Sequence, residues 1–537
     1  MYYIGIDLGT TYSTVCVMNS DDTVPKICKN PLKHLSTPSV VWFKNGEIIV
    51  GEKAVKGLME NTEEKTVAIC DSKRSFGDKN TKWVVTLENG EKQTYTPEDV
   101  ATLILKEMTQ FKDVKKILDS GEEYRCVITR PASYDSRQNQ LVIDAAIRAG
   151  FNQKGLDEKG HEVYHVSTTS EPTAAAISYC ITQPNFDKGG LLIFDLGGGT
   201  FDTTTMWKDG NVYRELVLEG ISHLGGRDWD ARILLELQKQ YAKHHKISQS
   251  DVENDPTISS ILKSECEEIK KCLTASGKFE GCIYALSATE KFSLNQQEFE
   301  ECSKDLLDQA FLHVDLALEE SPKVAVKRKI NNFRIDAVVL VGGSSKMKQI
   351  EKNFIEKYPQ FNDKVILVEP DMAIAKGAAY WARYGVGAKE EEKSKSGIKK
   401  TGTTDTPTAI KVIDMYTNIN RSYGVKILDH NDKECINNLI FINDEAPLDS
   451  KTNRYVTTSQ SDNITIEIYS NVSSEQYVQL NDVKSDLKIV GKFVVEFGHD
   501  VPAGTPVKVK MHMEQNTLTA ICIDEKKHET VKPFNTL

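Results

Sequence analysis

Two glycine-rich turns follow apolar strands, and each turn has an aspartate just ahead of it. The first aspartate is Asp7, and the turn after it contains Gly9, Thr10, Thr11 and Tyr12. Glycine lets a backbone approach a ligand closely, and successive N–H groups of such a turn form a concavity that suits a phosphate. An aspartate beside the turn can hold a metal ion through its bound water. This stretch therefore predicts phosphate and metal chemistry.

The same order of strand, aspartate and turn returns later in the chain. Asp195 precedes Gly197, Gly198, Gly199 and Thr200. Two unrelated hairpins or one duplicated domain could both give this pattern, and the matching order favours duplication. Two such turns that face each other would clamp the phosphates of one nucleotide.

Two further glycine pairs lie at the ends of predicted elements. Gly342 and Gly343 follow the apolar strand predicted over 335–341, and ligands of α/β sheets bind at such strand ends. Gly225 and Gly226 precede a predicted helix. The start of that helix is either an anion site or an ordinary capped helix N-terminus.

Several charged residues have two possible interpretations. Lys73 lies in a short polar stretch, where a lysine is usually solvated. Glu171 opens a predicted helix, either as a simple N-terminal acid or as a group that holds metal or water near phosphates. The predicted helix 258–273 has one apolar face and a charged stripe on the other, which is either solvated or grips a nucleoside. The stripe consists of Glu267, Lys270, Lys271 and Thr274.

The elements that must position these groups alternate between strands and helices. Thr96 and the proline after it predict a helix start. Strands are predicted over 124–129 and 163–168, and helices over 136–149 and from Ser170 onward. This alternation indicates an α/β fold.

The bulk composition bounds the class of protein. The chain has 537 residues, 39% hydrophobic and 27% charged, which predicts a globular protein of two to four domains. Its net charge of −11 argues against nucleic acid or an anionic membrane as a partner. We find no apolar run long enough for a transmembrane helix, and a first strand that begins at Tyr2 leaves no room for a signal peptide. The 11 scattered cysteines indicate reduced thiols, so we expect a cytoplasmic protein.

The pattern changes twice along the chain. Residues 1–386 read as the α/β part, and 387–408 as a polar flexible linker. Residues 409–537 alternate with a period of two, which predicts a small all-β sandwich.

Five stretches make the chain similar to the 70-kDa heat-shock chaperone family, closely over about residues 2–385 and weakly over about 409–525. The stretches are Ile6–Ser13, Glu171–Ala176, Asp195–Asp202, His223–Gly226 and Val339–Ser344. The resemblance implies an actin-like ATPase of two duplicated lobes with nucleotide in the cleft, followed by the β-sandwich. It also implies ATP or ADP, Mg²⁺ and K⁺ as cofactors.

The resemblance assigns roles residue by residue. Asp7 and Asp195 would hold Mg²⁺ through waters, and Lys73 would stabilise charge at the γ-phosphate and orient the attacking water. Glu171, Thr200 and Asp202 would complete the hydrolytic site. The residues implied to surround the nucleotide are Gly9, Thr10, Thr11, Tyr12, Gly197, Gly198, Gly199, Thr200, Gly225, Gly226, Glu267, Lys270, Lys271, Thr274, Gly342, Gly343, Ser344, Lys346 and Asp371.

The chain departs from the family pattern at two places. The family clamps adenine between two arginines, and the matching residues here are Lys271 and Lys346. Lysine lacks the planar guanidinium, so each lost contact costs about 0.5–2 kcal/mol and we expect weaker ATP binding. The polar linker replaces a run of leucines, which puts interdomain coupling in question.

The β-domain is implied to bind extended or unfolded peptides. Val456, Ile464 and Ile466 either line a peptide pocket or are plain sandwich core. We expect no C-terminal helical lid, and without a lid peptide should dissociate quickly. J-domain cochaperones and nucleotide-exchange factors are the other implied partners.

Three functions compete for this sequence. The first is an ATP-dependent chaperone-type ATPase. The second is a nucleotide-binding regulator or cochaperone that binds ATP but hydrolyses it poorly. The third is a small-molecule kinase on the same fold, against which the β-domain and the stretch that begins at Glu171 argue.

Overall fold

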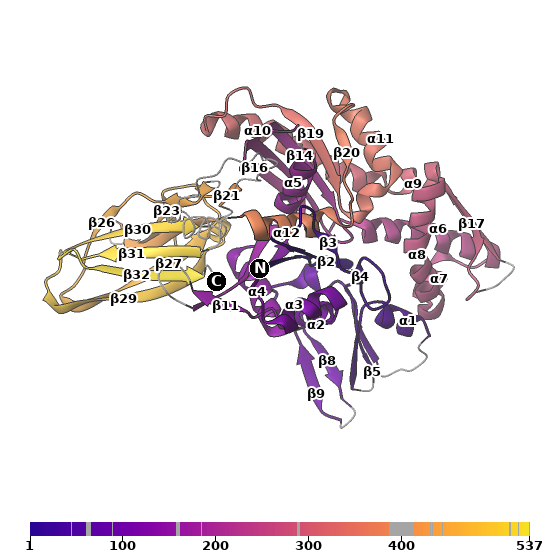
Figure 1. Cartoon of the computed structure of the whole chain (residues 1–537), viewed down its shortest axis with the longest axis horizontal. Coiled ribbons are helices and arrows are strands. Elements are labelled where there is room, and N and C mark those ends of the chain that lie inside the picture. Colours follow the sequence, from indigo (N-terminus) through magenta and orange to yellow (C-terminus); the bar gives the residue numbers. More distant parts are fainter. Residues whose placement is uncertain are drawn as a thin grey trace. The chain divides into compact units, whose positions relative to one another are not determined.

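A computed structural model shows how the chain folds (Figure 1). It describes residues 1–44, 46–60, 66–87, 90–156, 162–183, 185–286, 290–385, 413–419, 421–429, 431, 433–442, 444–514, 517–524 and 526–535. There are two compact units. The first comprises Met1–Ala132, Ala145–Asn211 and Val217–Ile413, and the second comprises Ser133–Asp144, Val212–Leu216 and Asp414–Leu537. The linker predicted over 387–408 lies outside the described residues.

The first unit contains a mixed sheet of order β13-β10-β1-β2-β3. β1 runs antiparallel to β2 and parallel to β10, and β10 runs parallel to β13. The turn between β1 and β2 is the first glycine-rich turn. The strands of this sheet are β1 (Tyr2–Asp7), β2 (Tyr12–Asn19), β3 (Lys26–Ile27), β4 (Thr37–Pro38, paired with β2), β10 (Tyr124–Arg130) and β13 (Val166–Ser170).

A second mixed sheet of the first unit repeats that topology, with order β20-β19-β14-β15-β16. β14 runs antiparallel to β15 and parallel to β19, and β19 runs parallel to β20. The second glycine-rich turn joins β14 to β15, so the predicted duplication is confirmed. The strands are β14 (Lys188–Leu196), β15 (Phe201–Asp209), β16 (Val212–Ile221), β19 (Ile335–Val341) and β20 (Val365–Leu367).

Two of the helices begin at residues that the sequence predicts as helix starts. Thr96 and Asp99 form a capping box at the start of α2, and Ser170 caps α5. The helices are α1 (Glu52–Glu60), α2 (Pro97–Thr109), α3 (Lys112–Ser120), α4 (Ser136–Ala149), α5 (Glu171–Thr182), α6 (Gly226–His245), α7 (Gln249–Asn254), α8 (Pro256–Ser276), α9 (Gln296–Cys302), α10 (Lys304–Lys327), α11 (Lys348–Lys357) and α12 (Ala373–Tyr384). Among the described residues, no helix combines the length and apolar character that crossing a membrane requires.

One segment in the small sheets of the first unit differs from its predicted extent. The strand predicted over 163–168 is wrong in extent, because the chain changes partner at His165. Residues before it pair with β11 and residues after it pair with β10. The strands are β5 (Val41–Lys44), β6 (Glu47–Val50), β7 (Thr66–Ile69), β8 (Trp83–Thr86), β9 (Lys92–Tyr95), β11 (Lys154–Leu156), β12 (Glu162–Tyr164), β17 (Lys278–Cys282) and β18 (Lys291–Asn295).

Small residues bring α5, α12 and β1 close together (Figure 1). A methyl group added at Gly377 of α12 would lie 1.8 Å from the carbonyl oxygen of Ala174 in α5. One added at Gly5 of β1 would lie 2.3 Å from the carbonyl oxygen of Ala375. The backbones therefore touch without side chains between them. This packing holds the end of β1, the start of α5 and the start of α12 at one place.

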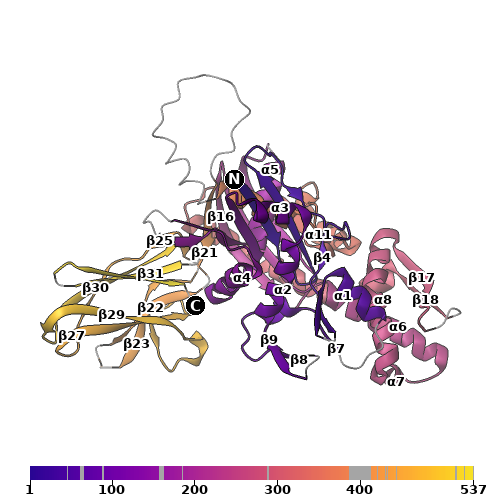
Figure 2. The ribbon, with the colours of Figure 1, turned by 60° about the horizontal axis from the view of Figure 1, so that its bottom comes forward.

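The second unit contains two antiparallel sheets with a shared core, as the alternating pattern predicts. Figure 2 shows them as two layers. One has the order β28-β23-β22-β27-β29, and the other has the order β25-β30-β31-β32 with β26 beside β30. The strands are β22 (Ser422–Leu428), β23 (Glu434–Ile440), β25 (Leu448–Asp449), β26 (Asn453–Val456), β27 (Ser461–Asn471), β28 (Tyr477–Gln479), β29 (Lys488–Val501), β30 (Pro506–Glu514), β31 (Thr517–Ile523) and β32 (Glu529–Asn535).

Two shorter strands complete the second unit. β21 (Asp414–Asn418) pairs in parallel with the first residues of β16, which also belong to this unit. β24 (Glu445–Ala446) pairs with β21. None of the 11 cysteines forms a disulfide in the structure.

The close contact of α12 with α5 predicts the effect of one added methyl group. Gly377→Ala gains helix propensity of about 1 kcal/mol. We expect overpacking to outweigh that gain and to lower the free energy of unfolding by about 1–3 kcal/mol. The midpoint of urea unfolding measures this, and an unchanged or higher midpoint would show that the two helices have room to move apart.

Candidate functional site

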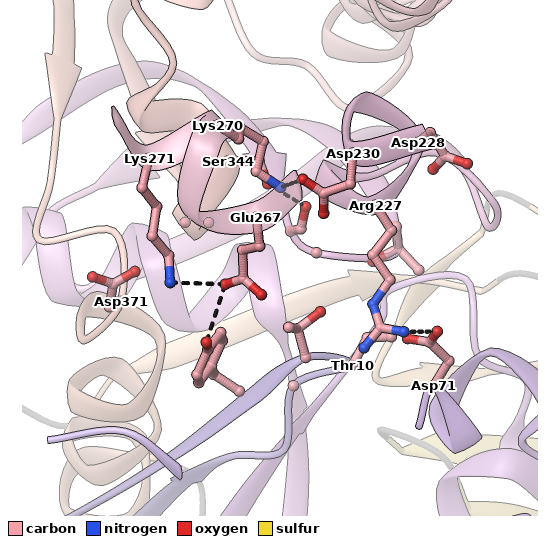
Figure 3. A pocket seen from close by; sticks show the side chains of 18 of the residues that line it. Thr10, Asp71, Arg227, Asp228, Asp230, Glu267, Lys270, Lys271, Ser344 and Asp371 are labelled. Carbon is pink, nitrogen blue, oxygen red and sulfur yellow. Dashed lines mark hydrogen bonds and ion pairs between the residues drawn. The ribbon is translucent and has the colours of Figure 1, made fainter. Parts of the chain in front are cut away.

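A pocket of about 1220 Å³ in the first unit is lined by residues from both duplicated sheets and from α8 (Figure 3). Most of the predicted site residues meet there. Those that line it are Asp7, Gly9, Thr10, Thr11, Tyr12, Lys73, Glu171, Asp195, Gly197, Gly198, Thr200, Glu267, Lys270, Lys271, Thr274, Gly342, Gly343, Ser344, Lys346 and Asp371. The volume is of the size that small-molecule sites need.

Four predicted residues lie behind the pocket lining. Asp202 is directly opposite Asp195 across the β14–β15 ladder and is 4% exposed. A methyl group at Gly225 would lie 2.5 Å from the backbone nitrogen of Gly199. Gly199 and Gly226 are likewise enclosed by neighbouring side chains. These four residues shape the turn and its support rather than the pocket surface.

The two glycine-rich turns lie directly against each other at the pocket wall. A methyl group added at Gly198 would lie 1.9 Å from Oγ1 of Thr11, and one at Gly199 would lie 2.6 Å from Cγ2 of Thr10. Only glycine allows this approach, so the second turn must be glycine-rich for the first turn to lie against it. The facing arrangement is the one that the sequence predicts for clamping phosphates.

The start of α6 is already capped by protein groups. The N–H groups of Gly226 and Arg227 donate to the carbonyl oxygens of Gly197 and Gly198, at 2.9 and 3.0 Å. Asp228 accepts from the N–H of Gly225 at 2.7 Å. Of the two interpretations of this helix start, the geometry supports the capped N-terminus.

Four carboxylates gather beside a single ammonium at the base of the turns. Lys73 forms an ion pair with Glu171, and both side chains are less than 10% exposed. Asp7 lies at the end of β1, where Thr129 donates a hydrogen bond to it at 3.1 Å. Asp195 and Asp202 are both 4% exposed. One ammonium cannot balance four ionised acids, so burying all four in their charged form is unfavourable.

Burial, together with the neighbouring carboxylates, raises the pKa of three of these acids. Burial, with the neighbouring charge of Glu171, raises the pKa of Asp7 to about 7, although Lys73 opposes the shift. The same causes raise the pKa of Asp202 to about 7. Burial and three neighbouring carboxylates hold the pKa of Asp195 well above its ordinary value. A divalent cation would relieve these shifts, because it favours the ionised carboxylates.

The residues present fit Mg²⁺ held through water. Oδ2 of Asp195 and Oγ1 of Thr11 are buried and find no hydrogen-bond partner among the described residues. Within that part of the chain, no three His, Cys, Asp or Glu side chains are placed to bind one metal ion directly. Mg²⁺ keeps several waters and takes only one or two carboxylates. Asp7 and Asp195 are the residues that would hold its waters.

The other end of the pocket is lined by lysines that already have acidic partners. Lys270 contacts Asp230 and the carbonyl oxygen of Gly226, both at 2.8 Å. Lys271 contacts Glu267 at 3.0 Å, and the hydroxyl of Tyr12 donates to the same Glu267 oxygen at 3.0 Å (Figure 3).

The hydrogen bond from Lys271 counters burial and lowers the pKa of Glu267. Lys346 forms an ion pair with Asp371.

Two ion pairs at the pocket mouth were not foreseen from the sequence. Arg227 pairs with Asp71 (Figure 3), and Arg74 pairs with Asp228 at 3.2 Å. Each joins the short 3₁₀ turn around Lys73 to the first turn of α6, although the partners are about 150 residues apart in sequence. Arg227 and Asp228 follow the predicted glycine pair Gly225 and Gly226, and Asp71 and Arg74 lie in the polar stretch around Lys73; these two locations were the available signal. Their pairing depends on the fold and has no signature in sequence spacing.

The candidate peptide residues belong to the second unit and differ in exposure. Val456 is 57% exposed, whereas Ile466 is 8% exposed and belongs to the sandwich core. Ile464 is partly buried and packs against that core. For Ile466, burial supports the core interpretation. The peptide role of Val456 and Ile464 stays a prediction.

Comparison with known proteins places these observations in one family. The family model described as Hsp70 protein matches residues 3–535, which is nearly the whole chain. The match therefore covers both compact units.

Individual relatives agree with the family match. A protein named chaperone protein DnaK from Thermosipho melanesiensis is 31% identical over 388 residues, covering 71% of this chain and 59% of the relative. The protein of the same name from Thermosipho africanus is also 31% identical, with 71% and 58% coverage. A heat shock 70 kDa protein from Neurospora crassa is 30% identical over 402 residues, with 71% and 57% coverage. The matched region is thus less than two thirds of the length of these curated relatives.

The raised pKa values predict that magnesium acts more strongly at alkaline pH. Folded Asp7 and Asp202 have pKa values near 7, above the ordinary value of 3.8. Their stabilising contribution is therefore complete below about pH 4 and is lost as the pH rises to about 7. Mg²⁺ requires the ionised acids, so below pH 7 its apparent affinity falls about tenfold per pH unit for each proton displaced.

The measurement is the gain in melting temperature that Mg²⁺ adds to the protein in saturating ADP. We expect a larger gain at pH 8 than at pH 6, and a smaller gain in Asp7→Asn at pH 8. Samples without Mg²⁺ at each pH are the control. An equal gain at both pH values would contradict the assignment of Asp7 to the metal.

Proposed function

Because this chain belongs to the Hsp70 family, we propose that it is a chaperone-type ATPase. It hydrolyses ATP, with Mg²⁺ and K⁺, in the pocket of the first unit. The second unit binds extended apolar peptides. The fold that carries this activity is the actin-like ATPase of two duplicated lobes followed by a β-sandwich.

The observation that carries the proposal is the buried pair of Lys73 and Glu171 beside the two facing turns. Phosphoryl transfer needs positioning and charge stabilisation more than covalent help from the protein. The turns position the phosphates, and Lys73 supplies positive charge where the γ-phosphate would lie. Mg²⁺, when bound, would neutralise charge on the phosphate oxygens.

The remaining acids orient water in this proposal. Glu171 and Asp202 lie close enough to Asp195 to raise its pKa, so they form one electrostatic group. Ionised carboxylates accept hydrogen bonds, and a water held by two of them presents its lone pair to the phosphorus. Thr200, at the end of the second turn, would hold the same water from the phosphate side.

The partners follow from the family and from the second unit. Two of the relatives are named chaperone proteins, and we propose that this chain likewise acts on unfolded polypeptides. Exposed Val456 and neighbouring Ile464 would contact apolar side chains of an extended peptide. J-domain cochaperones and nucleotide-exchange factors are the proposed regulators. The free cysteines are those of a protein that works in the reducing cytosol.

A paired substitution tests the role of Lys73. Lys73→Ala alone would leave Glu171 as a buried, uncompensated charge, which typically costs about 3–5 kcal/mol of stability. The double variant Lys73→Met/Glu171→Gln removes both charges together. We expect single-turnover ATP hydrolysis to fall by about 100-fold or more, because a preorganised charge at the phosphoryl group is lost. We expect ATP affinity to change by less than about tenfold.

Two further variants make that result specific. Glu171→Gln alone keeps Lys73. Any further fall in the hydrolysis rate in the double variant therefore measures the contribution of Lys73. Lys364→Met removes a partly buried lysine outside the pocket that binds the carbonyl oxygen of Ile335 at 2.8 Å. Its hydrolysis rate should match wild type. Normal turnover in the double variant would refute the assignment, and ATP binding without turnover in wild type would favour a regulator.

The ion pairs at the pocket mouth predict the rate of nucleotide release. Arg227–Asp71 and Arg74–Asp228 must separate if the pocket mouth is to open. Partly exposed pairs contribute up to about 1 kcal/mol each, so Asp71→Asn should speed ADP dissociation by about threefold to fivefold. Stopped-flow release of a fluorescent ADP measures this. The swap Asp71→Arg/Arg227→Asp should restore the slow rate, and failure of the single variant to speed release would exclude a gating role.

A further inference from the structure

The pocket has two chemically different ends. The turns, Lys73 and the buried acids occupy the end that suits phosphates and metal. We start from the proposed function, in which the phosphates lie at this end. The nucleoside must then lie at the opposite end of the pocket. The described residues that line that end include Glu267, Lys271, Thr274, Lys346 and Asp371.

The ammonium groups at the nucleoside end are bound to carboxylates of the protein itself. Lys271 lies 3.0 Å from Glu267 and 2.8 Å from Glu268. Lys346 pairs with Asp371. An ammonium is a compact charge without the flat face that a guanidinium lays on a base. Neither lysine therefore offers a stacking surface.

The hydroxyl groups at this end donate their protons within the protein. Oγ1 of Thr274 donates to the carbonyl oxygen of Lys270 at 2.9 Å. Oγ of Ser344 donates to the carbonyl oxygen of Gly197 at 2.9 Å. Strong selection of one ligand over an analogue comes from polar groups that only the right ligand can satisfy. These two hydroxyls are satisfied already, so they have no proton left with which to select a base edge.

The aromatic ring that lines the pocket already has a cation over it. Tyr12 is the one aromatic residue among the described residues that line the pocket. Its hydroxyl donates to Glu267, and the ammonium of Lys271 lies 5.7 Å from its ring centroid. Apolar side chains of Ala275, Met347 and Ile374 also line the pocket. Apolar contact distinguishes poorly between bases of similar size.

We propose that the pocket accepts nucleoside triphosphates with little regard for the base. Affinity comes from the phosphates, the metal and the ribose, while Lys271 serves to position Glu267 and does not hold the base. ATP would then be the working substrate because of its supply and not because of a base-specific contact.

Competition binding on the full chain tests this proposal. Unlabelled ATP, GTP, CTP and UTP each displace radiolabelled ATP in the presence of Mg²⁺. We expect the four inhibition constants to agree within about tenfold. ATP that binds more than about tenfold more tightly than the other three would overturn the inference while leaving the proposed function intact. Failure of ATP itself to bind would overturn both.

A double substitution tests whether the two lysines are the cause of the weak selection between bases. Lys271→Arg/Lys346→Arg supplies two planar cations, which stack better on the larger purines. We expect ATP and GTP to gain at least about threefold in affinity over CTP and UTP. The control is Lys239→Arg, whose lysine pairs with Glu236 one turn away at 2.6 Å, as Lys271 pairs with Glu268, but outside the pocket lining. Equal changes for purine and pyrimidine nucleotides would contradict the part assigned to the two lysines.

Discussion

The buried ion pair between Lys73 and Glu171 is the interaction on which the site depends. It places one ammonium among four carboxylates that the two duplicated sheets bring together. The charges of these groups, if all were ionised, would add to a net negative charge in a region that excludes much of the water. Burial and this charge together raise the pKa values of Asp7, Asp195 and Asp202. Such a cluster is costly on its own. In the proposed function, a divalent cation bound with the phosphates would balance the charge of the ionised carboxylates, and this would offset the cost of burying them.

Other cations in the pocket are also paired with acids of the chain, as Lys73 is with Glu171. Lys271 and Lys346 at the nucleoside end, and Arg227 at the mouth, each contact an acid of the chain itself. These pairs fix the pocket walls without a ligand. They also leave the walls with little to offer a base. In the proposed function, recognition is therefore concentrated at the phosphate end of the pocket, where glycine backbone and buried charge meet.

The sequence carried enough to predict the scaffold of the site, and less to predict its contacts. Asp7 and Asp195 and their turns are local patterns, and the duplication they indicate appears as two sheets of the same order. Helix α4 and strand β19 have the predicted bounds because capping residues and apolar runs are local signals too. The pairing of Arg227 with Asp71 and the capping of α6 by carbonyls of the second turn depend on which segments meet after folding. Neither contact produces a periodic pattern in the sequence, so both could be found only from the structure.

The central claim is that this pocket hydrolyses ATP. The most direct measurement is single-turnover conversion of ATP to ADP and phosphate by the full chain with Mg²⁺ and K⁺, at protein concentrations in excess of nucleotide. The account predicts that bound ATP is converted to ADP and phosphate in a reaction that requires Mg²⁺. Bound ATP that stays intact throughout would contradict it, since the carboxylates and Lys73 would then hold a nucleotide on which they do no chemistry.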